Sequence, residues 1–249
     1  SGDEAAGVAA RTVEERVAAK TVLAEVPLWV LRDSPVVPYE DDEITRAIDD
    51  GLDLVAYEKI KDKTAGELRA WILDEATSSE DIAAISKGLT GEMAAAVTKL
   101  CSSLDLIVGA KKMPCVVHNV CTMGLPGRIG SRLQPNNPTD NVDAIRAEIY
   151  DGFSFCIGDQ VLGINPAIDQ YENLMKLYDM MWEITTRWEV PSSNCILSHV
   201  TTQMECLKKG AKIGQVFQSI AGTQKALESF GVEVGMLDEA NELAKKYCY

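Results

Sequence analysis

The sequence predicts an α/β protein. It has an all-helical N-terminal region at residues 1–112 and, at residues 113–249, about the first four βα units of a TIM-type (β/α)8 barrel. Two patterns predict this fold: apolar residues recur at helical spacing in the first part, and short apolar runs alternate with helical runs in the second. Neither GxGxxG nor GxxxxGK(S/T) follows a predicted strand, so no motif favours a dinucleotide-binding or P-loop fold.

The N-terminal region carries helical spacing in several stretches. Residues 13–26 place valine and leucine among charged residues, and residues 42–61 repeat isoleucine, leucine and valine at helical spacing. Thr64 and Glu67 form a capping box that opens a further helix. The last expected helix buries one face, whose members are spaced four, three and four apart: Met93, Val97, Leu100 and Leu104.

The C-terminal part contains four short apolar runs, each followed by a helical run. Parallel strands require crossover connections, and these helices supply them, so we expect a parallel sheet covered by helices. In a barrel of this kind, polar residues at the carboxyl ends of the strands form the functional site. The four runs include residues 127–135, 153–166, 194–202 and 213–222.

Each of these runs ends in polar side chains. Arg132 and Gln134 are two residues apart, so on a strand they face the same side and aim several donors and an acceptor at one small ligand. A loop or helix cap explains any single residue equally well, but four successive polar strand ends favour a site. The residues are Arg132, Gln134, Asn136, Asn165, His199, Thr201, Thr202, Gln218, Ser219 and Thr223.

Cysteine and histidine allow a functional and a structural interpretation. Cys115, His118 and Cys121 have a spacing that resembles a zinc site, but nothing nearby completes the ligand set, so ordinary thiols are favoured and no metal site is expected. His199 could act in acid–base chemistry or be hydrogen-bonded at the barrel mouth, and we favour the second interpretation. Cys195 lies inside a predicted strand and is expected in the core.

The composition restricts the partners and the location. Among 249 residues, 46% are apolar and 25% are charged, which is typical of a globular protein. The net charge of −14 argues against nucleic acid and against an anionic membrane surface as partners. No apolar run reaches the ~20 residues of a membrane span, and the first residues lack the features of a signal peptide. Seven cysteines without a regular frame fit reduced thiols in the cytoplasm.

Blocks of sequence across nearly the whole chain, including the strand ends, follow a recognisable order. They are SGD, AGVAA and ERVAAK (within 1–20), YEDDEITR (39–46), KGLTGE (87–92), GAKKMP (109–114), RLQPN (132–136), IGDQVLGINP (157–166), HVTTQ (199–203), FQSIAG (217–222) and FGVEVGMLDEA (230–240). Together they resemble the large subunit of ethanolamine ammonia-lyase. The set is specific because several blocks are long.

The resemblance implies a (β/α)8 barrel behind a helical arm, a large-subunit homo-oligomer, and a cobalamin-binding small subunit as partner. It implies adenosylcobalamin as cofactor and the conversion of ethanolamine, a small amino alcohol, to acetaldehyde and ammonia. In that chemistry the cofactor's cobalt–carbon bond breaks homolytically, and the protein binds, orients and shields the reactants. The implied location is the cytoplasm or a bacterial microcompartment within it.

The resemblance also implies roles for individual residues. Arg132 and Gln134 would hydrogen-bond the hydroxyl side of the substrate, and Asn165 would help to fix its amino end. The corrin ring, which is broad and partly apolar, would lie over the mouth of the barrel. The residues against it would be Pro166, Gln218, Ser219 and Phe230.

This chain departs from the family pattern by ending after four βα units, and the family's substrate-binding carboxylates belong to the half that would follow. We therefore expect a fragment that is inactive alone. An alternative is a non-catalytic half-barrel that serves as an assembly or cofactor-docking module. A weaker alternative is a barrel lyase or aldolase with a Schiff-base lysine. It is disfavoured because Lys111 and Lys112 precede the first strand end, and the other strand ends carry no lysine.

Overall fold

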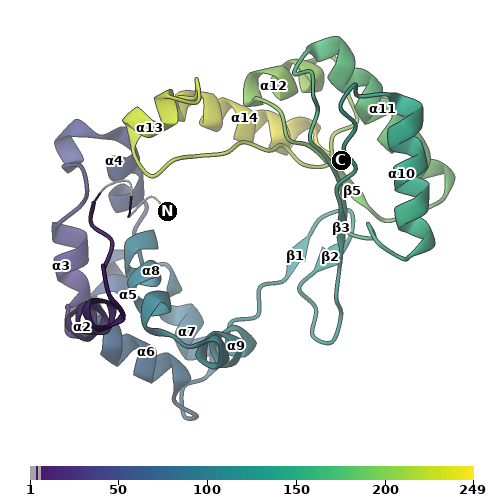
Figure 1. Cartoon of the computed structure of the whole chain (residues 1–249). Helices are drawn as coiled ribbons and strands as arrows, with labels where there is room; N and C mark the ends of the chain where they lie inside the picture. Colours follow the sequence, from purple (N-terminus) through teal and green to yellow (C-terminus); the bar gives the residue numbers. More distant parts are fainter. Residues whose placement is uncertain (1–3, 5–6) are drawn as a thin grey trace. The chain divides into compact units, whose positions relative to one another are not determined.

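The computed structural model describes Glu4 and residues 7–249, and the chain divides into two compact units, residues 1–114 and 115–249 (Figure 1). The first block quoted above falls partly on residues 1–3 and 5–6, which lie outside the described residues. No helix in the described part of the chain is both long and apolar enough to cross a membrane.

The first unit consists of helices, as the sequence predicts, and has its own apolar core. That core includes Leu28, Tyr57, Ile60, Leu68, Met93 and Val97. The helices are α2 (Val13–Ala24), α3 (Leu28–Asp33), a 3-10 turn η1 (Tyr39–Asp41), α4 (Glu43–Asp50), α5 (Leu54–Glu58), α6 (Ala65–Leu73), α7 (Ser79–Ser86), α8 (Gly91–Leu100) and α9 (Ser103–Lys112).

Capping residues decide where these helices begin. The predicted capping box at α6 is confirmed: the Thr64 hydroxyl accepts from the Glu67 N–H at 3.1 Å, and the Glu67 carboxylate accepts from the Thr64 N–H at 2.8 Å. Ser78 opens α7 and Ser102 opens α9 with the same reciprocal pair of bonds. Each box satisfies two backbone donors that the first helical turn leaves without a partner.

The same capping chemistry divides a stretch of continuous helical spacing into two separate helices. Residues 42–61 form α4 and α5, because the Asp53 carboxylate accepts from the N–H groups of Val55 and Ala56 and starts a new helix. The prediction that Leu104 continues the buried helix face of Met93, Val97 and Leu100 is wrong. Ser102 starts α9 after α8 has ended, and Leu104 is 67% exposed.

The second unit contains a small parallel sheet and a separate hairpin. The strands β3, β4 and β5 pair in that order, and β1 pairs with β2 antiparallel. The strands are β1 (Val117–His118), β2 (Thr122–Met123), β3 (Arg132–Leu133), β4 (Val161–Ile164) and β5 (Ser193–Ile196). The helices are α10 (Val142–Ser154), α11 (Tyr171–Arg187), α12 (Val200–Lys208), α13 (Gln224–Glu228) and α14 (Val234–Tyr247).

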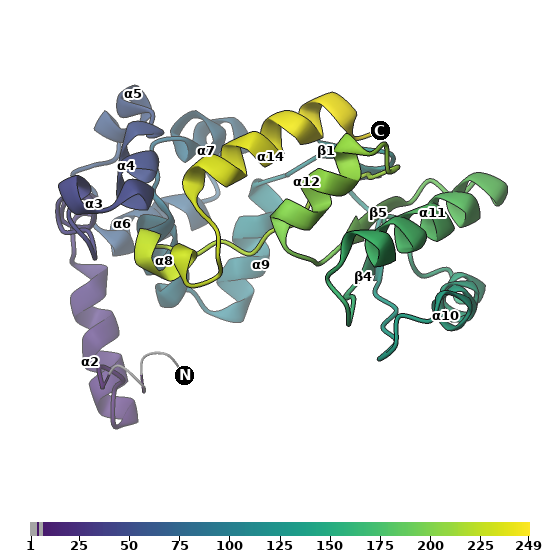
Figure 2. The ribbon, with the colours of Figure 1, turned by 90° about the horizontal axis from the view of Figure 1, so that it is seen from above.

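One face of the parallel sheet packs against helices (Figures 1 and 2). Leu162, Ile164 and Ile196 point into a core that α10, α11 and α12 complete, and all three are fully buried. Because side chains alternate along a strand, Val161, Gly163 and Cys195 belong to the opposite face. Each strand therefore has a second face that these helices do not cover.

The fold prediction is confirmed only in its coarser part. A helical N-terminal region and a small parallel sheet with helices are present, but the described residues form no closed barrel. The second predicted run shortens to β4, because residues 153–154 end α10 and a turn follows before the strand begins. The third run is β5, and its last predicted residues already belong to α12.

The fourth predicted strand is reduced to a single parallel bridge between Cys195 and Gln215. In place of a full ladder of backbone bonds, two buried carboxamide side chains bond to this segment. The Asn194 side chain donates to the Lys212 carbonyl and accepts from the Gly214 N–H, both at 2.8 Å. The Gln203 side chain accepts from the Phe217 N–H at 2.9 Å. Segment 212–217 therefore lies beside β5 but is held largely by side chains.

Candidate functional site

The carboxyl ends of the three parallel strands meet at one edge of the sheet. Arg132 pairs with Val161, which in turn pairs with Ser193, so the three strands are aligned. Gln134 therefore follows β3 at the same edge where Asn165 follows β4. A hydrogen bond joins the two loops directly, since the Asn136 carbonyl oxygen Oδ1 accepts from the Asn165 N–H at 3.2 Å.

Arg132 reaches from β3 across to β4. An ideal Cβ placed on Gly163 would lie 2.3 Å from Nη2 of Arg132 and 2.7 Å from its Cζ and Nε. The guanidinium thus lies against the bare backbone of Gly163, on the face opposite the helices. All three residues that the resemblance assigns to the substrate are exposed: Arg132, Gln134 and Asn165.

Cys195 lies next along this face, because it pairs with Gly163 in the register of β4 and β5. It is 3% exposed, as expected for a core thiol. Burial raises the pKa of the Cys195 thiol, and the positive charge of Arg132 offsets part of that rise. The thiol is therefore protonated at neutral pH, which makes Cys195 a lining group and a poor nucleophile.

The hairpin turn closes the amino end of the same face. Asn119 Nδ2 donates to Ser193 Oγ at 3.3 Å, and the Cys121 thiol donates to the Gln160 carbonyl at 3.6 Å. His118 bonds to Thr122 within the hairpin at 3.1 Å. In the described part of the chain, no three His, Cys, Asp or Glu side chains are grouped so that they could hold a metal ion.

Asp140 holds the loop that follows Asn165, and sequence reasoning missed it. Its carboxylate accepts from the N–H groups of Ala167 and Ile168 and from Asn173 Nδ2, each at 2.8 Å. Asp140 is 4% exposed and has a φ of 50°, a conformation that Asp tolerates better than most residues. No sequence motif marks this role, because its partners lie 27 to 33 residues away.

At the start of α12, hydrogen bonds join the loop that follows β4 to the loop that follows β5 and to the segments at Gln218 and Phe230. The His199 N–H donates to Asp169 at 2.7 Å, and the Val200 N–H donates to Gln218 Oε1 at 2.8 Å. His199 Nδ1 bonds to Thr201 at 2.7 Å, and Nε2 bonds to the Phe230 carbonyl at 3.2 Å. With both ring nitrogens engaged, His199 matches the hydrogen-bonded interpretation.

These contacts divide the sequence-predicted residues into two groups. Arg132 lies on β3, Asn165 directly follows the neighbouring strand β4, and Gln134 belongs to the loop between β3 and α10. The Gln218 carboxamide and the Phe230 carbonyl meet at the start of α12, and Ser219 follows Gln218 as an exposed residue. Pro166 shares its loop with Asp169, so hydrogen bonds connect that loop to both groups.

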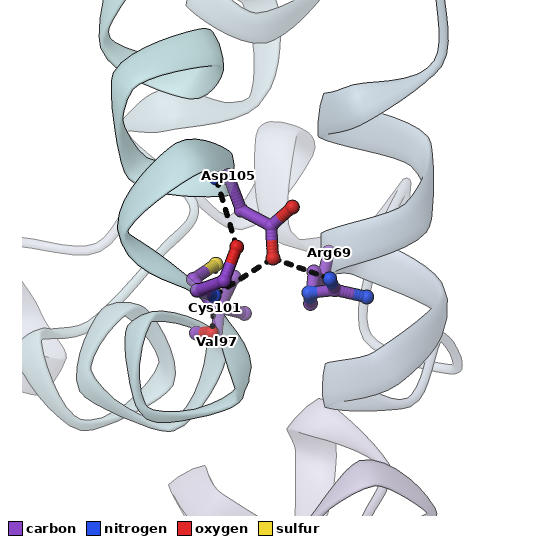
Figure 3. Close-up of polar contacts among 5 residues, drawn as sticks. Arg69, Val97, Cys101 and Asp105 are labelled. Carbon is purple, nitrogen blue, oxygen red and sulfur yellow. Dashed lines mark hydrogen bonds and ion pairs between the residues drawn. The ribbon is translucent and has the colours of Figure 1, made fainter.

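A polar cluster in the first unit is structural (Figure 3). Arg69 Nη2 on α6 lies 2.5 Å from Asp105 Oδ2 on α9, and Asp105 also accepts from the Ser102 N–H at 2.8 Å. These bonds lower the pKa of Asp105 to about 2, and the Arg69 bond is the larger cause. The Cys101 thiol donates to the Val97 carbonyl at 3.3 Å. The cluster joins two helices and caps one of them.

An apolar groove of about 610 Å³ lies toward the amino ends of the strands. It is formed largely by the segments that precede β3, β4 and β5, so it does not include the carboxyl edge. Its lining residues are Ile129, Tyr150, Phe153, Cys156, Ile157, Asp159, Trp188 and Val190.

Comparison with known proteins gives a consistent result over the whole chain. The family model for the ethanolamine ammonia lyase large subunit (EutB) matches residues 1–249. The chain is 48% identical to the ethanolamine ammonia-lyase large subunit of Escherichia coli K12, over 247 residues that are 99% of this chain and 54% of that protein. It is 47% identical to the Salmonella typhimurium LT2 protein with the same coverage. The chain thus spans about half the length of these relatives.

Proposed function

The chain belongs to the ethanolamine ammonia-lyase large-subunit family, and we propose that it forms part of an enzyme that converts ethanolamine to acetaldehyde and ammonia. One observation supports this most strongly. Arg132 lies on β3 with its guanidinium against Gly163 of the neighbouring strand β4, and at the carboxyl edge the loop that contains Gln134 is bonded to the loop that begins at Asn165. A fold with parallel strands and crossover helices places ligands at this edge.

We propose that residues 113–249 are the first part of a (β/α)8 barrel and that residues 1–112 are a separate helical region. The order β3-β4-β5 with helices on one face supports this proposal. The bridge at Gln215 extends the parallel order by one further segment. The remaining strands would come from the part of the family that lies beyond this chain.

In the proposed site, Arg132 and Gln134 hold the substrate hydroxyl and Asn165 helps to orient the amino end. A guanidinium offers donors in a fixed fork, and a carboxamide offers both donor and acceptor. These groups fix orientation without exchanging protons, which suits a substrate radical that must be held in one geometry. We propose that a carboxylate from outside residues 1–249 pairs with the substrate ammonium, as the family resemblance implies.

The residues near α12 fit a corrin ring. Phe230 is 50% exposed and Ile220 is 68% exposed, and Ser219, directly before Ile220 in sequence, offers an exposed hydroxyl. A broad ring that is apolar on its faces and polar at its rim matches such a surface. Adenosylcobalamin, when bound, supplies the radical that takes hydrogen from the substrate. We propose that Pro166 and Gln218 complete this contact.

The proposed partners are a small subunit, which would share the cobalamin site, and further large subunits in a homo-oligomer. We propose a cytoplasmic location, either free or inside a microcompartment. These proposals rest on family membership.

The test is an ethanolamine deamination assay on the complete large subunit with its small subunit and adenosylcobalamin. We expect Arg132→Ala to lower turnover by about 10²-fold or more while the subunits still assemble. Arg128→Ala is the matched control, since Arg128 is exposed and precedes β3. Near-normal turnover in Arg132→Ala would remove Arg132 from the site. A defined oligomer without any turnover would favour a docking module.

A further inference from the structure

We infer that Gly163 is a positioning residue: the missing side chain at the centre of β4 gives the Arg132 guanidinium its place on the sheet. The consequence for turnover rests on the proposed function. The packing itself rests on geometry alone.

The distances leave no room for even one methyl group. A Cβ on Gly163 would lie 2.3 Å from Arg132 Nη2 and 2.7 Å from both Cζ and Nε. Carbon and nitrogen atoms that are not bonded rest about 3.5 Å apart or more. One of the two groups must therefore move when a side chain is added at this position.

The strand is the less movable group. β4 is the central strand, and it pairs with β3 on one side and with β5 on the other. Leu162 and Ile164, which flank Gly163, are fully buried against the helices. Arg132 is instead an exposed side chain with several rotatable bonds. An alanine at 163 would thus push the guanidinium away from the sheet and leave β4 in place.

The backbone of Gly163 does not require glycine, because its φ lies outside the left-handed region. Glycine inside a strand weakens that strand, and a common reason for it is close approach by another group. Here the approaching group is the guanidinium. On the far side, Cys195 is buried next to Gly163 and feels the same charge. The Arg132 guanidinium therefore has one defined position, against Gly163 of β4 and near Cys195 of β5.

The first arm of the test measures stability and needs no activity. Urea unfolding of the full chain is compared for the unsubstituted protein, Gly163→Ala, Arg132→Ala and the double variant. We expect Gly163→Ala to lower the midpoint when Arg132 is present, and to leave it unchanged or raise it when Arg132 is absent. Gly235→Ala is the control, since a Cβ there meets nothing within 4 Å. Equal effects in both backgrounds would overturn the inference.

The second arm measures kcat and KM for ethanolamine in the complete enzyme. We expect Gly163→Ala to lower kcat/KM by about 10²-fold, and the double variant to be no worse than Arg132→Ala alone. A double variant far below Arg132→Ala would show a general structural defect and overturn the positioning role. Normal kcat/KM in Gly163→Ala would overturn it too. No turnover in the unsubstituted enzyme would count against the proposed function, and the first arm would still decide where the guanidinium lies.

Discussion

Ser102 in the helical unit and Asp140 in the sheet unit show two different ways in which a polar side chain stabilises this chain. In the helical unit, Ser102 and Asp105 bond to each other across three residues and start their own helix. In the sheet unit, Asp140 bonds to the N–H of Ala167, 27 residues away, and ties two loops together. Capping of this first kind is a local property of the chain, whereas the second kind appears only once the strands are parallel. The carboxyl edge is thus held by bonds that the fold itself creates.

Asn194→Ala in the sheet unit removes bonds between distant parts of the chain, and we expect it to have the largest effect on stability. Asn194 is fully buried, and its carboxamide serves the Lys212 carbonyl and the Gly214 N–H. Removing it leaves the buried Gly214 N–H and the partly buried Lys212 carbonyl without these bonds, so we expect a loss of about 3 kcal/mol in the free energy of unfolding. Urea unfolding measures this loss. Asn241→Ala on the exposed side of α14 is the control, and an equally small effect in both would refute the prediction.

Asp140→Ala is expected to have a smaller and more local effect. Three donors lose a buried carboxylate, which should cost about 2 kcal/mol. The amides of Ala167 and Ile168 should exchange with deuterium faster than in the unsubstituted protein, while amides in α11 should not. Asp140→Asn keeps one acceptor and tolerates the same φ, so its effect should be milder. Unchanged exchange at Ala167 and Ile168 in Asp140→Ala would show that the clamp does not hold the loop.

Thr64→Ala tests the local kind of bond in the helical unit. The hydroxyl serves one N–H at the start of α6, so its loss should cost about 1 kcal/mol. Thermal or urea unfolding checks this value, and Thr64→Ser, which keeps the hydroxyl, should stay close to the unsubstituted protein. A cost near that of Asn194→Ala would erase the contrast between the two units.

Asp105→Asn should have the smallest effect and a distinctive pH dependence. Arg69 holds the pKa of Asp105 at about 2, below its ordinary 3.8. A lowered pKa stabilises the folded state above pH 3.8, and this contribution disappears as the pH falls toward 2. The variant should therefore be slightly less stable than the unsubstituted protein at pH 7 and equal to it near pH 2. A difference that grows on acidification would contradict the assignment.

The same contrast explains what the sequence could predict. The capping box at Thr64 and Glu67 was predictable because its members are three residues apart. The polar strand ends led to the prediction that Arg132 and Asn165 are site residues, which stays a prediction; the loops that follow β3 and β4 are bonded to each other. Leu104 was placed wrongly because apolar spacing continued across a helix boundary that Ser102 defines.

The supports of the carboxyl edge were beyond sequence reasoning. Asp140 and Asn194 look like ordinary loop and strand residues until their distant partners are known. The prediction of a fourth strand was wrong for the same reason. The Asn194 side chain bonds to the Lys212 carbonyl and the Gly214 N–H, where backbone bonds of a strand ladder were expected. Gly163 did leave a signal: an isolated glycine within an apolar strand suggests close approach of another group.

The hairpin turn lies at the amino end of the helix-free face, where Asn119 bonds to Ser193 and Cys121 bonds to Gln160. We therefore expect a ligand on this face to approach from the carboxyl side, past Gln134 and Asn165. A cofactor that covered the carboxyl side would then control both the entry of the substrate and the release of the product.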